Sequence, residues 1–270
     1  MGVPTWPDLI SELVGGRDLP AAEIRWAMGE ILQGAASPVQ VAAFAVALRT
    51  KGETVEELSG MADVMLEFAT AIELDREAVD VVGTGGDRAN TVNVSTMAAI
   101  TAAAAGARVV KHGNRAASSA CGTADVLEQV GIVLDLPPDA QQGVMDEAGL
   151  VFLFAAGYHS SLRHVAAVRR ELAVSTTFNF LGPMANPARP NAQAIGVADP
   201  RMAGLIAGVL AGRGARGLIF HGGDGLDELT TTTTSRVWLI HEGEVRESVF
   251  DPVQLGVPRA EVADLVGGSP

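Results

Sequence analysis

The stretch that decides the fold is AVDVVGTGGDRANTVNVST, residues 78–96. It opens with a valine-rich run, 78–82, which is typical of a short buried strand. The glycine-rich segment GTGGD at 83–87 ends this strand. A largely apolar segment at 94–105 then predicts a helix that Gly106 ends. The stretch therefore predicts a strand, a glycine-rich loop and a helix in immediate succession.

The same alternation of strand and helix continues downstream. Short apolar runs recur, and several are followed by a loop and a helical segment. These runs lie at 108–110, 151–154, 194–197 and 217–220. Strands that alternate with helices imply βαβ units and a mostly parallel sheet. The segment 235–245, with a turn at Glu242 and Gly243, predicts an antiparallel hairpin or edge strand. The threonine run 230–234 before it favours extended backbone, and we assign no chemistry to it.

Residues 1–75 show helical patterns only. Helices are expected at 8–14, 21–32, 39–48 and onward from Thr54. Thr54 and Glu57 have the spacing of a capping box, which marks the start of the last of these helices. The fold class is therefore α/β, with a small all-helical N-terminal domain at 1–75 and a larger α/β domain at 76–270 built on a mostly parallel central sheet.

The composition limits the partners that we expect. The chain has 270 residues, 48% of them hydrophobic, and a net charge of −13 from 19 Lys+Arg and 32 Asp+Glu. Nucleic acids and anionic membrane surfaces both require a basic face, so neither is expected as a partner. The single cysteine, Cys121, excludes an intrachain disulfide. Because the N-terminal sequence also lacks the pattern of a secretory signal, we expect a cytoplasmic enzyme or binding protein.

The glycine-rich loop after the first strand has the composition of an anion site. In an open parallel sheet, ligands bind outside the carboxyl ends of the strands. The glycines of 83–87 let backbone N–H groups approach a ligand, and the hydroxyls of Thr91, Ser95 and Thr96 lie at a helix N-terminus. The loop is neither a Walker A loop nor a dinucleotide fingerprint. It predicts a phosphate site, although a tight turn with polar caps would leave the same pattern.

Two more loops follow strands of the same predicted sheet. Lys111, Arg115 and two serine hydroxyls come after the second strand and predict a second phosphate site. Asp227 and Glu228 come after the strand at 217–220, in a glycine-rich loop that suits a hard cation such as Mg²⁺. An adjacent Asp and Glu are usually a solvated acidic surface. Opposite two phosphate loops, they predict a metal site.

Taken together, these loops resemble one known family. The motifs are GTGGD at 83–87, NVST at 93–96, KHGNRAASS at 111–119, FNFLGP at 178–183 and DGLDE at 224–228. Their order and spacing resemble those of anthranilate phosphoribosyltransferases over essentially the whole chain. The resemblance implies a helical domain joined to an α/β domain, as in pyrimidine nucleoside phosphorylases. Those phosphorylases have a similar lysine loop, but they lack the NVST signature directly after such a GGD.

The resemblance implies a transferase of tryptophan biosynthesis. Such an enzyme moves the phosphoribosyl group of 5-phosphoribosyl 1-pyrophosphate (PRPP) to the amine of anthranilate and releases pyrophosphate. It also implies two Mg²⁺ ions per subunit and a homodimer formed through the helical domain. No catalytic acid or base is assigned. Two alternatives stay open, a pyrimidine nucleoside phosphorylase-like transferase and a non-catalytic phosphoribosyl-binding relative.

The resemblance also implies which residues bind each ligand. The donor residues are Gly83, Gly86, Asp87, Thr91, Asn93, Val94, Ser95, Thr96, Lys111 and Ser119. The acceptor residues are Gly83, Asn114 and Arg169, with His112 and His159 near the entry path of the anthranilate. The metal residues are Ser95 for one Mg²⁺ and Asp227 and Glu228 for the second.

The sequence also departs from the family pattern, most clearly as follows. Arg88 stands where the family commonly has glycine. The segment 154–164 lacks two prolines that the family pattern would have. The chain ends at Pro270, before the point where family members normally end, so we expect an α/β domain that is shortened at its C-terminus.

Overall fold

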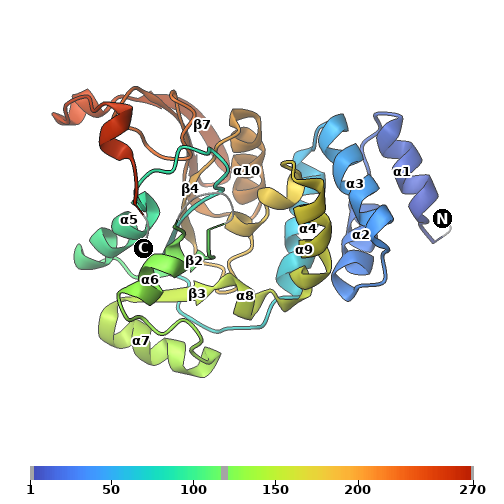
Figure 1. Ribbon diagram of the computed structural model, residues 1–270, viewed down its shortest axis with the longest axis horizontal. Coiled ribbons are helices and arrows are strands. Elements are labelled where there is room, and N and C mark those ends of the chain that lie inside the picture. The colour runs from blue at the N-terminus through green and yellow to red at the C-terminus, as the bar shows by residue number, and fades with distance from the viewer. Residues whose placement is uncertain (1–2, 117–120, 269–270) are drawn as a thin grey trace. The chain divides into compact units, whose positions relative to one another are not determined.

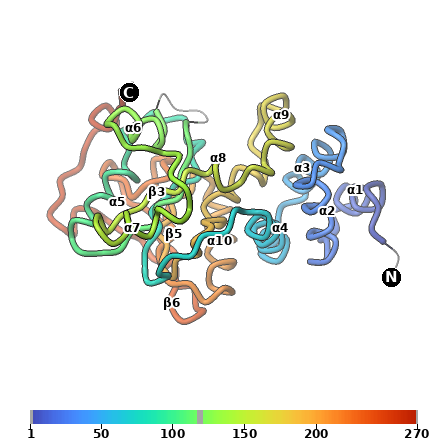
Figure 2. The backbone as a smooth tube through the Cα atoms, turned by 90° about the horizontal axis from the view of Figure 1, so that it is seen from below, coloured from blue at the N-terminus to red at the C-terminus, as the bar shows by residue number. Residues whose placement is uncertain are grey.

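The computed structural model describes residues 3–116 and 121–268. The chain forms two compact units, and Figures 1 and 2 show its course through each of them. Unit 1 consists of Met1–Thr70 and His159–Ala185, and unit 2 consists of Ala71–Tyr158 and Asn186–Pro270.

Unit 1 is built from α-helices. They are α1 (Trp6–Val14), α2 (Ala21–Gln33), α3 (Pro38–Lys51), α4 (Val55–Glu67) and α9 (Arg163–Leu172). A capping box begins α4, in which Thr54 and Glu57 each bind the backbone N–H of the other residue. This geometry confirms the helix start that their spacing predicted, because both side chains satisfy N–H groups that the first helical turn leaves unpaired.

The segment His159–Ala185 lies outside the predicted boundaries of the helical domain. The sequence analysis divided the chain into 1–75 and 76–270, but this segment belongs to the compact helical unit. Its helix α9 packs against α2 and α3. Beyond α9, the Thr177 hydroxyl donates a hydrogen bond to the buried Glu53 carboxylate over 2.6 Å. The segment joins unit 1 because its partners lie there, and pairing between such distant residues leaves no mark on local sequence patterns.

Unit 2 contains a seven-stranded sheet in the order β3-β2-β1-β4-β5-β6-β7. Its strands are β1 (Val79–Gly83), β2 (Val109–Gly113), β3 (Leu150–Phe154), β4 (Ala192–Gly196), β5 (Arg216–Gly222), β6 (Ser235–His241) and β7 (Glu244–Phe250). The strands from β3 to β5 pair in parallel, whereas β6 and β7 pair antiparallel. Both the mostly parallel sheet and the terminal hairpin are therefore confirmed.

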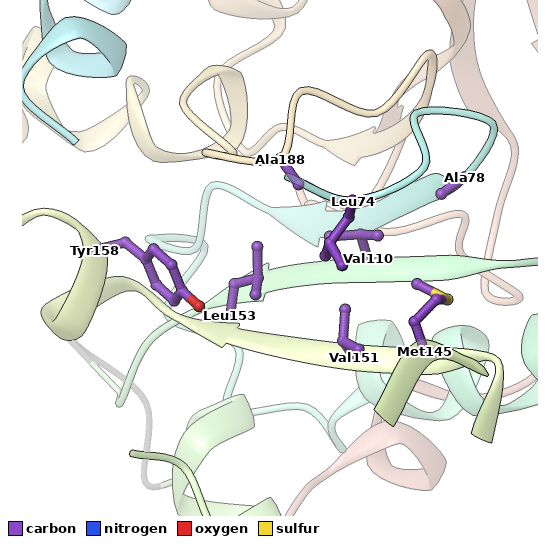
Figure 3. Close-up of a cluster of buried hydrophobic side chains, with 8 residues drawn as sticks. All are labelled: Leu74, Ala78, Val110, Met145, Val151, Leu153, Tyr158 and Ala188. Atoms are coloured by element: carbon purple, nitrogen blue, oxygen red, sulfur yellow. The ribbon is translucent and has the colours of Figure 1, made fainter. Parts of the chain in front are cut away.

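Helices lie over both faces of this sheet. Figure 1 shows α5 (Val94–Ala104) and α6 (Thr123–Gln129) on the side opposite to α10 (Pro200–Gly212). The face away from α5 also carries α7 (Gln141–Ala148) and the short α8 (Ala155–Tyr158). There, Met145 of α7 packs with Val110, Val151 and Leu153 from the strands, as Figure 3 shows. In the described ranges, no helix is both long enough and apolar enough to cross a membrane.

Candidate active site

The glycine loop, defined here as residues 83–93, connects the carboxyl end of β1 to α5. Gly85 and Gly86 have φ angles of 65° and 90°, in the left-handed region where glycine has no Cβ penalty. Arg88 and Asn90 share this region with φ angles of 61° and 52°. Left-handed residues close together turn the chain sharply and aim successive N–H groups to one side, which is how a backbone binds an anion.

The N-terminus of α5 follows this loop directly. Its N-cap residue, Asn93, makes no capping hydrogen bond with its side chain. Instead, the Asn93 carboxamide oxygen accepts a hydrogen bond from the Thr96 hydroxyl over 2.5 Å. Ser95 lies in the same first turn, after Val94. The N–H groups of this turn therefore receive no side-chain cap among the described residues, and such groups bind phosphate readily.

Lys111 of β2 lies under the first turn of α5. Its ammonium donates to the Ser95 hydroxyl over 3.1 Å and to the Val81 carbonyl oxygen. Only 2% of Lys111 is exposed. Burial lowers the pKa of Lys111 to about 8, although nearby Asp80 and Glu228 favour its charged form. The ammonium is thus held at the joint of β1, β2 and α5 by neutral acceptors.

Asp80 of β1 lies beneath this region and is completely buried. Its carboxylate accepts hydrogen bonds from the His112 backbone N–H over 3.1 Å and from the Asn186 carboxamide over 2.9 Å. Burial raises the pKa of Asp80 to about 6, against the opposing effects of Lys111 and of these donors. The sequence patterns do not predict a role for Asp80 or Asn186. The available signal was a lone carboxylate inside a valine-rich strand, because a buried charge is normally paired or hydrogen-bonded.

The acidic loop, residues 224–228, lies directly on the ends of β1 and β4. A Cβ on Gly83 would collide with the Asp227 carboxylate, and a Cβ on Gly196 would collide with the Asp227 backbone carbonyl. The Gly85 N–H donates to Asp227 Oδ2 over 2.7 Å. The glycine loop and the acidic loop are therefore in direct contact, and glycine is needed at both strand ends for that approach.

Three carboxylates gather at this contact. Burial and the charge of Asp87 raise the pKa of Asp227, and burial with the charge of Asp227 raises the pKa of Glu228 to about 8. Asp87 Oδ2 is buried and meets no donor among the described residues. The cluster therefore brings three carboxylates close together, and the charge of Lys111 offsets their repulsion only in part.

This cluster fits a divalent cation bound together with a substrate. Within the described ranges, no three His, Cys, Asp or Glu side chains form a complete metal site. Mg²⁺ requires no such cage, because it usually binds through one or two carboxylates, waters and substrate phosphates. A bound cation would also favour the ionised form of every carboxylate around it. The residues present are therefore compatible with Mg²⁺ held jointly with an anionic substrate.

The other predicted donor residues lie around the same strand ends. Gly86 is exposed and Asp87 half-buried in the glycine loop. Thr91 pairs with Val266 in an isolated antiparallel bridge near the end of the described chain. Ser119 lies outside the described residues. Apart from Ser119, the structure thus brings the predicted donor residues and both predicted acidic metal residues to one edge of the sheet in unit 2.

Arg115 differs from the expectation that it serves the second phosphate site. Its guanidinium forms ion pairs with Glu128 at 2.7 Å and with Asp125 at 3.1 Å. Hydrogen bonds to these two carboxylates raise the pKa of Arg115. Asp125 and Glu128 of α6 therefore neutralise its charge. The sequence does not indicate this pairing, because the two acids lie 10 and 13 residues further along the chain.

The predicted acceptor residues come from both units. In unit 2, Asn114 is exposed and His112 is buried. In unit 1, His159 is buried and its Nε2 lies 2.9 Å from the Ala185 carbonyl oxygen, while burial lowers its pKa. Burial also lowers the pKa of Arg169, which forms no ion pair with any described residue.

Two family models match the chain. The α/β domain of the glycosyl transferase family matches residues 75–270, and the helical bundle domain of the same family matches residues 7–69. The helical unit and the α/β unit with its mostly parallel sheet therefore place the chain in this class of transferase.

Curated relatives and solved structures narrow the class. An anthranilate phosphoribosyltransferase from a Nocardioides species is 59% identical over 264 residues, which cover 98% of this chain and 77% of that protein. The crystal structure of the enzyme of that name from Thermus thermophilus matches with a TM-score of 0.90 and 42% identity, covering 97% of this chain and 79% of that one. The Saccharomyces cerevisiae enzyme in complex with PRPP and Mg matches with a TM-score of 0.88 and 26% identity, covering 98% and 77%. The chain belongs to the anthranilate phosphoribosyltransferase family.

Proposed function

We propose that this chain transfers the phosphoribosyl group of PRPP to the amine of anthranilate and releases pyrophosphate, a step of tryptophan biosynthesis. One observation carries the proposal beyond the family relationship. A glycine loop, an uncapped helix N-terminus, a buried lysine and an acidic loop meet at one edge of the sheet. These features suit a donor that bears several phosphates. The loop N–H groups, the helix N-terminus and Lys111 favour its negative charge, and the acidic loop could hold a cation beside it, in a protein with a net charge of −13.

The donor is proposed to bind through the residues of this edge. Backbone N–H groups from the glycine loop and from the first turn of α5 would hold phosphate oxygens, with the hydroxyls of Thr91, Ser95 and Thr96 nearby. Lys111 would supply a positive charge at the joint of the two strands. Ser119 is proposed for the same role from the family pattern alone.

Mg²⁺ is the proposed cofactor, with two ions per subunit. Ser95 would contribute to one site, and Asp227 and Glu228 to the other. When bound, such ions stabilise the negative charge that grows on the departing pyrophosphate. The carboxylates of this chain would anchor the ions, and the N–H groups of the glycine loop would orient the diphosphate group.

Acceptor binding is proposed for Gly83, Asn114, Arg169, His112 and His159. The support in the structure is strongest for Arg169, because its guanidinium is partly buried and forms no ion pair with any residue that the structure describes, which suits the carboxylate of anthranilate. In the reaction the C1–O bond to pyrophosphate breaks, the bond from C1 to the amine nitrogen forms, and the amine loses a proton. No side chain is assigned to accept that proton, since positioning of the two substrates supplies much of such a rate enhancement.

A cytoplasmic homodimer is proposed for the assembled enzyme. The helical unit presents Val39 and Val46 on α3, which are 77% and 41% exposed and lie two helical turns apart. Apolar side chains that share an exposed helix face are typical of an interface. Sedimentation of a monomer at micromolar concentration would contradict this part of the proposal.

The deciding experiment follows the fluorescence of anthranilate. Addition of PRPP and Mg²⁺ to the protein with anthranilate should cause a loss of that fluorescence, and omission of either should prevent it. Cleavage of a pyrimidine nucleoside by phosphate without Mg²⁺ would indicate a phosphorylase instead. Thermal stabilisation by PRPP without turnover would indicate a non-catalytic binding protein.

A further inference from the structure

The threonine run 230–234 connects the acidic loop to β6. Its sequence predicted extended backbone and no chemistry. In the structure, two of its hydroxyls converge on a single carboxylate oxygen. Thr230 Oγ1 donates to Asp224 Oδ2 over 2.6 Å, and Thr232 Oγ1 donates to the same oxygen over 2.5 Å.

Asp224 also ties the beginning of the acidic loop to itself. Its Oδ1 accepts the Leu226 N–H over 3.3 Å. The Leu226 carbonyl oxygen in turn accepts the Gly222 N–H over 2.9 Å, which closes a tight turn at the end of β5. Burial opposes the charge of Asp224, but the hydrogen bonds from Thr230 and Thr232 outweigh it and keep its pKa below the usual value. One carboxylate therefore links the two arms of the loop.

The second arm is itself held in place by backbone contacts. The Gly223 N–H donates to the Thr234 carbonyl oxygen over 2.8 Å, and the Thr230 N–H donates to the Ser235 hydroxyl over 3.1 Å. The Ala260 N–H donates to the Thr231 carbonyl oxygen over 3.1 Å. The threonine run is thus a fixed support, and Asp224 connects the acidic loop to it.

Asp227 and Glu228 need such a support because of where they lie. Asp227 is buried at the contact of the acidic loop with the glycine loop, and Glu228 follows it directly in the chain. Carboxylates brought close together repel one another, so a loop without support would move them apart and toward water. At the same time Asp227 lies against Gly83 and Gly196 with no space for a Cβ at either, so a small shift would remove its contact with Gly85.

We infer that Thr230 and Thr232, acting through Asp224, are positioning residues that hold Asp227 and Glu228 ready to bind Mg²⁺ together with the pyrophosphate part of the donor. The inference rests on the proposed function. It assigns a role to the threonine hydroxyls, and it does not make Asp224 a metal ligand. The clamp, defined as Asp224, Thr230 and Thr232, stabilises the arrangement of the acidic loop before any ligand binds, which lowers the cost of ordering it on binding.

The test replaces threonine by valine, which keeps the branched shape and removes the hydroxyl. The variant Thr230→Val/Thr232→Val is compared with Thr233→Val, a threonine of the same run whose hydroxyl does not bind Asp224. Calorimetric titration with inorganic pyrophosphate at a series of Mg²⁺ concentrations gives the Mg²⁺ concentration for half-saturation. The clamp variant should need about tenfold more Mg²⁺, as expected from loss of charge-assisted hydrogen bonds, and Thr233→Val should match the wild type.

A pair of Asp224 variants separates positioning from folding. Asp224→Asn keeps an acceptor for the Leu226 N–H and an amide group that can donate to both threonine hydroxyls, but it removes the charge. Its Mg²⁺ half-saturation should therefore lie between those of the wild type and of Asp224→Ala. Asp224→Ala should behave like the double valine variant, while melting temperatures without ligand stay similar in all variants. Equal half-saturation for the clamp variant and Thr233→Val would overturn the inference, as would an Asn variant as impaired as Ala. Pyrophosphate binding by the wild type that does not depend on Mg²⁺ would overturn the proposed function as well.

Discussion

Lys51 in unit 1 and Lys111 in unit 2 are the two lysines of the chain, and both side chains are almost fully buried. Lys51 lies 2.7 Å from Glu57 and 2.6 Å from Asp18. Burial disfavours its charge, but the hydrogen bonds to the two carboxylates outweigh that effect and raise its pKa. Lys111 has a hydroxyl and a carbonyl oxygen as its partners, and burial lowers its pKa to about 8.

This contrast separates a charge that neighbouring carboxylates neutralise from one that we propose serves a ligand. The charge of Lys51 is neutralised within its own unit, where it connects α3 to Glu57 at the start of α4. The charge of Lys111 has no directly bonded carboxylate among the described residues and lies at the strand ends where ligands bind. A buried cation without an ion pair costs stability, and such a cost is typical of a site that awaits an anion.

The largest expected effect concerns the acids that face Lys111. In the double variant Asp227→Asn/Glu228→Gln, turnover should fall about a thousandfold or more, because metal stabilisation of leaving-group charge contributes several kcal/mol and each ~1.4 kcal/mol is tenfold. The melting temperature without ligand should not fall, since the change removes repelling, partly buried charges beside Asp87. Near-normal turnover at limiting Mg²⁺ would contradict the proposed role of the pair in holding the metal.

The variant Lys51→Met should lower the free energy of unfolding by about 3 kcal/mol, because it leaves the buried Glu57 carboxylate without its cation. Urea denaturation measures this change, and calorimetry on the folded protein should find unchanged PRPP affinity. Arg17→Met is the control, since Arg17 pairs with Glu12 at the surface and such pairs contribute about 1 kcal/mol or less. An equal decrease in the free energy of unfolding for the two variants would contradict the structural role of Lys51.

The matching variant in unit 2, Lys111→Met, should have the opposite pattern. Its affinity for PRPP in the presence of Mg²⁺ should fall about tenfold, the effect of losing one charge-assisted contact to phosphate. Its free energy of unfolding should not decrease, because a buried ammonium is replaced by an apolar side chain of similar length. Unchanged PRPP affinity at moderate salt would contradict the proposed role.

The two lysines should also differ in how they couple stability to pH. The folded-state pKa of Lys111, about 8, lies below its ordinary value of 10.5. Between these values the unfolded chain binds more protons at this residue, so its contribution to stability rises with pH. The pKa of Lys51 is raised, so its contribution is complete below pH 10.5 and is lost only above it. Urea denaturation at pH 8 and pH 10 measures the free energy of unfolding at each pH. From pH 8 to pH 10 this free energy should rise less, or fall more, for Lys111→Met than for the wild type. Lys51→Met should follow the wild type.

The smallest expected effect lies in the glycine loop. Arg88 has a φ of 61°, where a side chain costs about 1–2 kcal/mol. Arg88→Gly should therefore raise the free energy of unfolding by roughly 0.5 kcal/mol, after the entropy that glycine adds to the unfolded chain. Arg88→Ala keeps the strain and should give no such gain. Equal effects of Gly and Ala would mean that the loop is not strained at this position.

The sequence by itself determined the elements whose causes are local. The capping box of Thr54 and Glu57 acts within one turn, and the valine-rich run before Gly83 becomes a strand because its residues suit a buried, extended backbone. The order of strands and helices then implied a parallel sheet with its loops at one edge. The polar residues of those loops identified the kind of chemistry, because anion and metal binding restrict which residue types can serve.

Only the tertiary structure decided which partner each polar side chain has. Lys111 meets the Val81 carbonyl 30 residues away, Asp80 meets Asn186 across 106 residues, and Arg115 pairs with Asp125 and Glu128 of α6. The hydrogen bonds of the clamp and the place of His159–Ala185 in the helical unit likewise depend on contacts that form only in the folded chain. A hydrogen bond or an ion pair depends on distances of a few ångströms between atoms far apart in sequence. The residue types along the chain determine which side chains can form hydrogen bonds or ion pairs. The packing of strands and helices determines which of these pairs form.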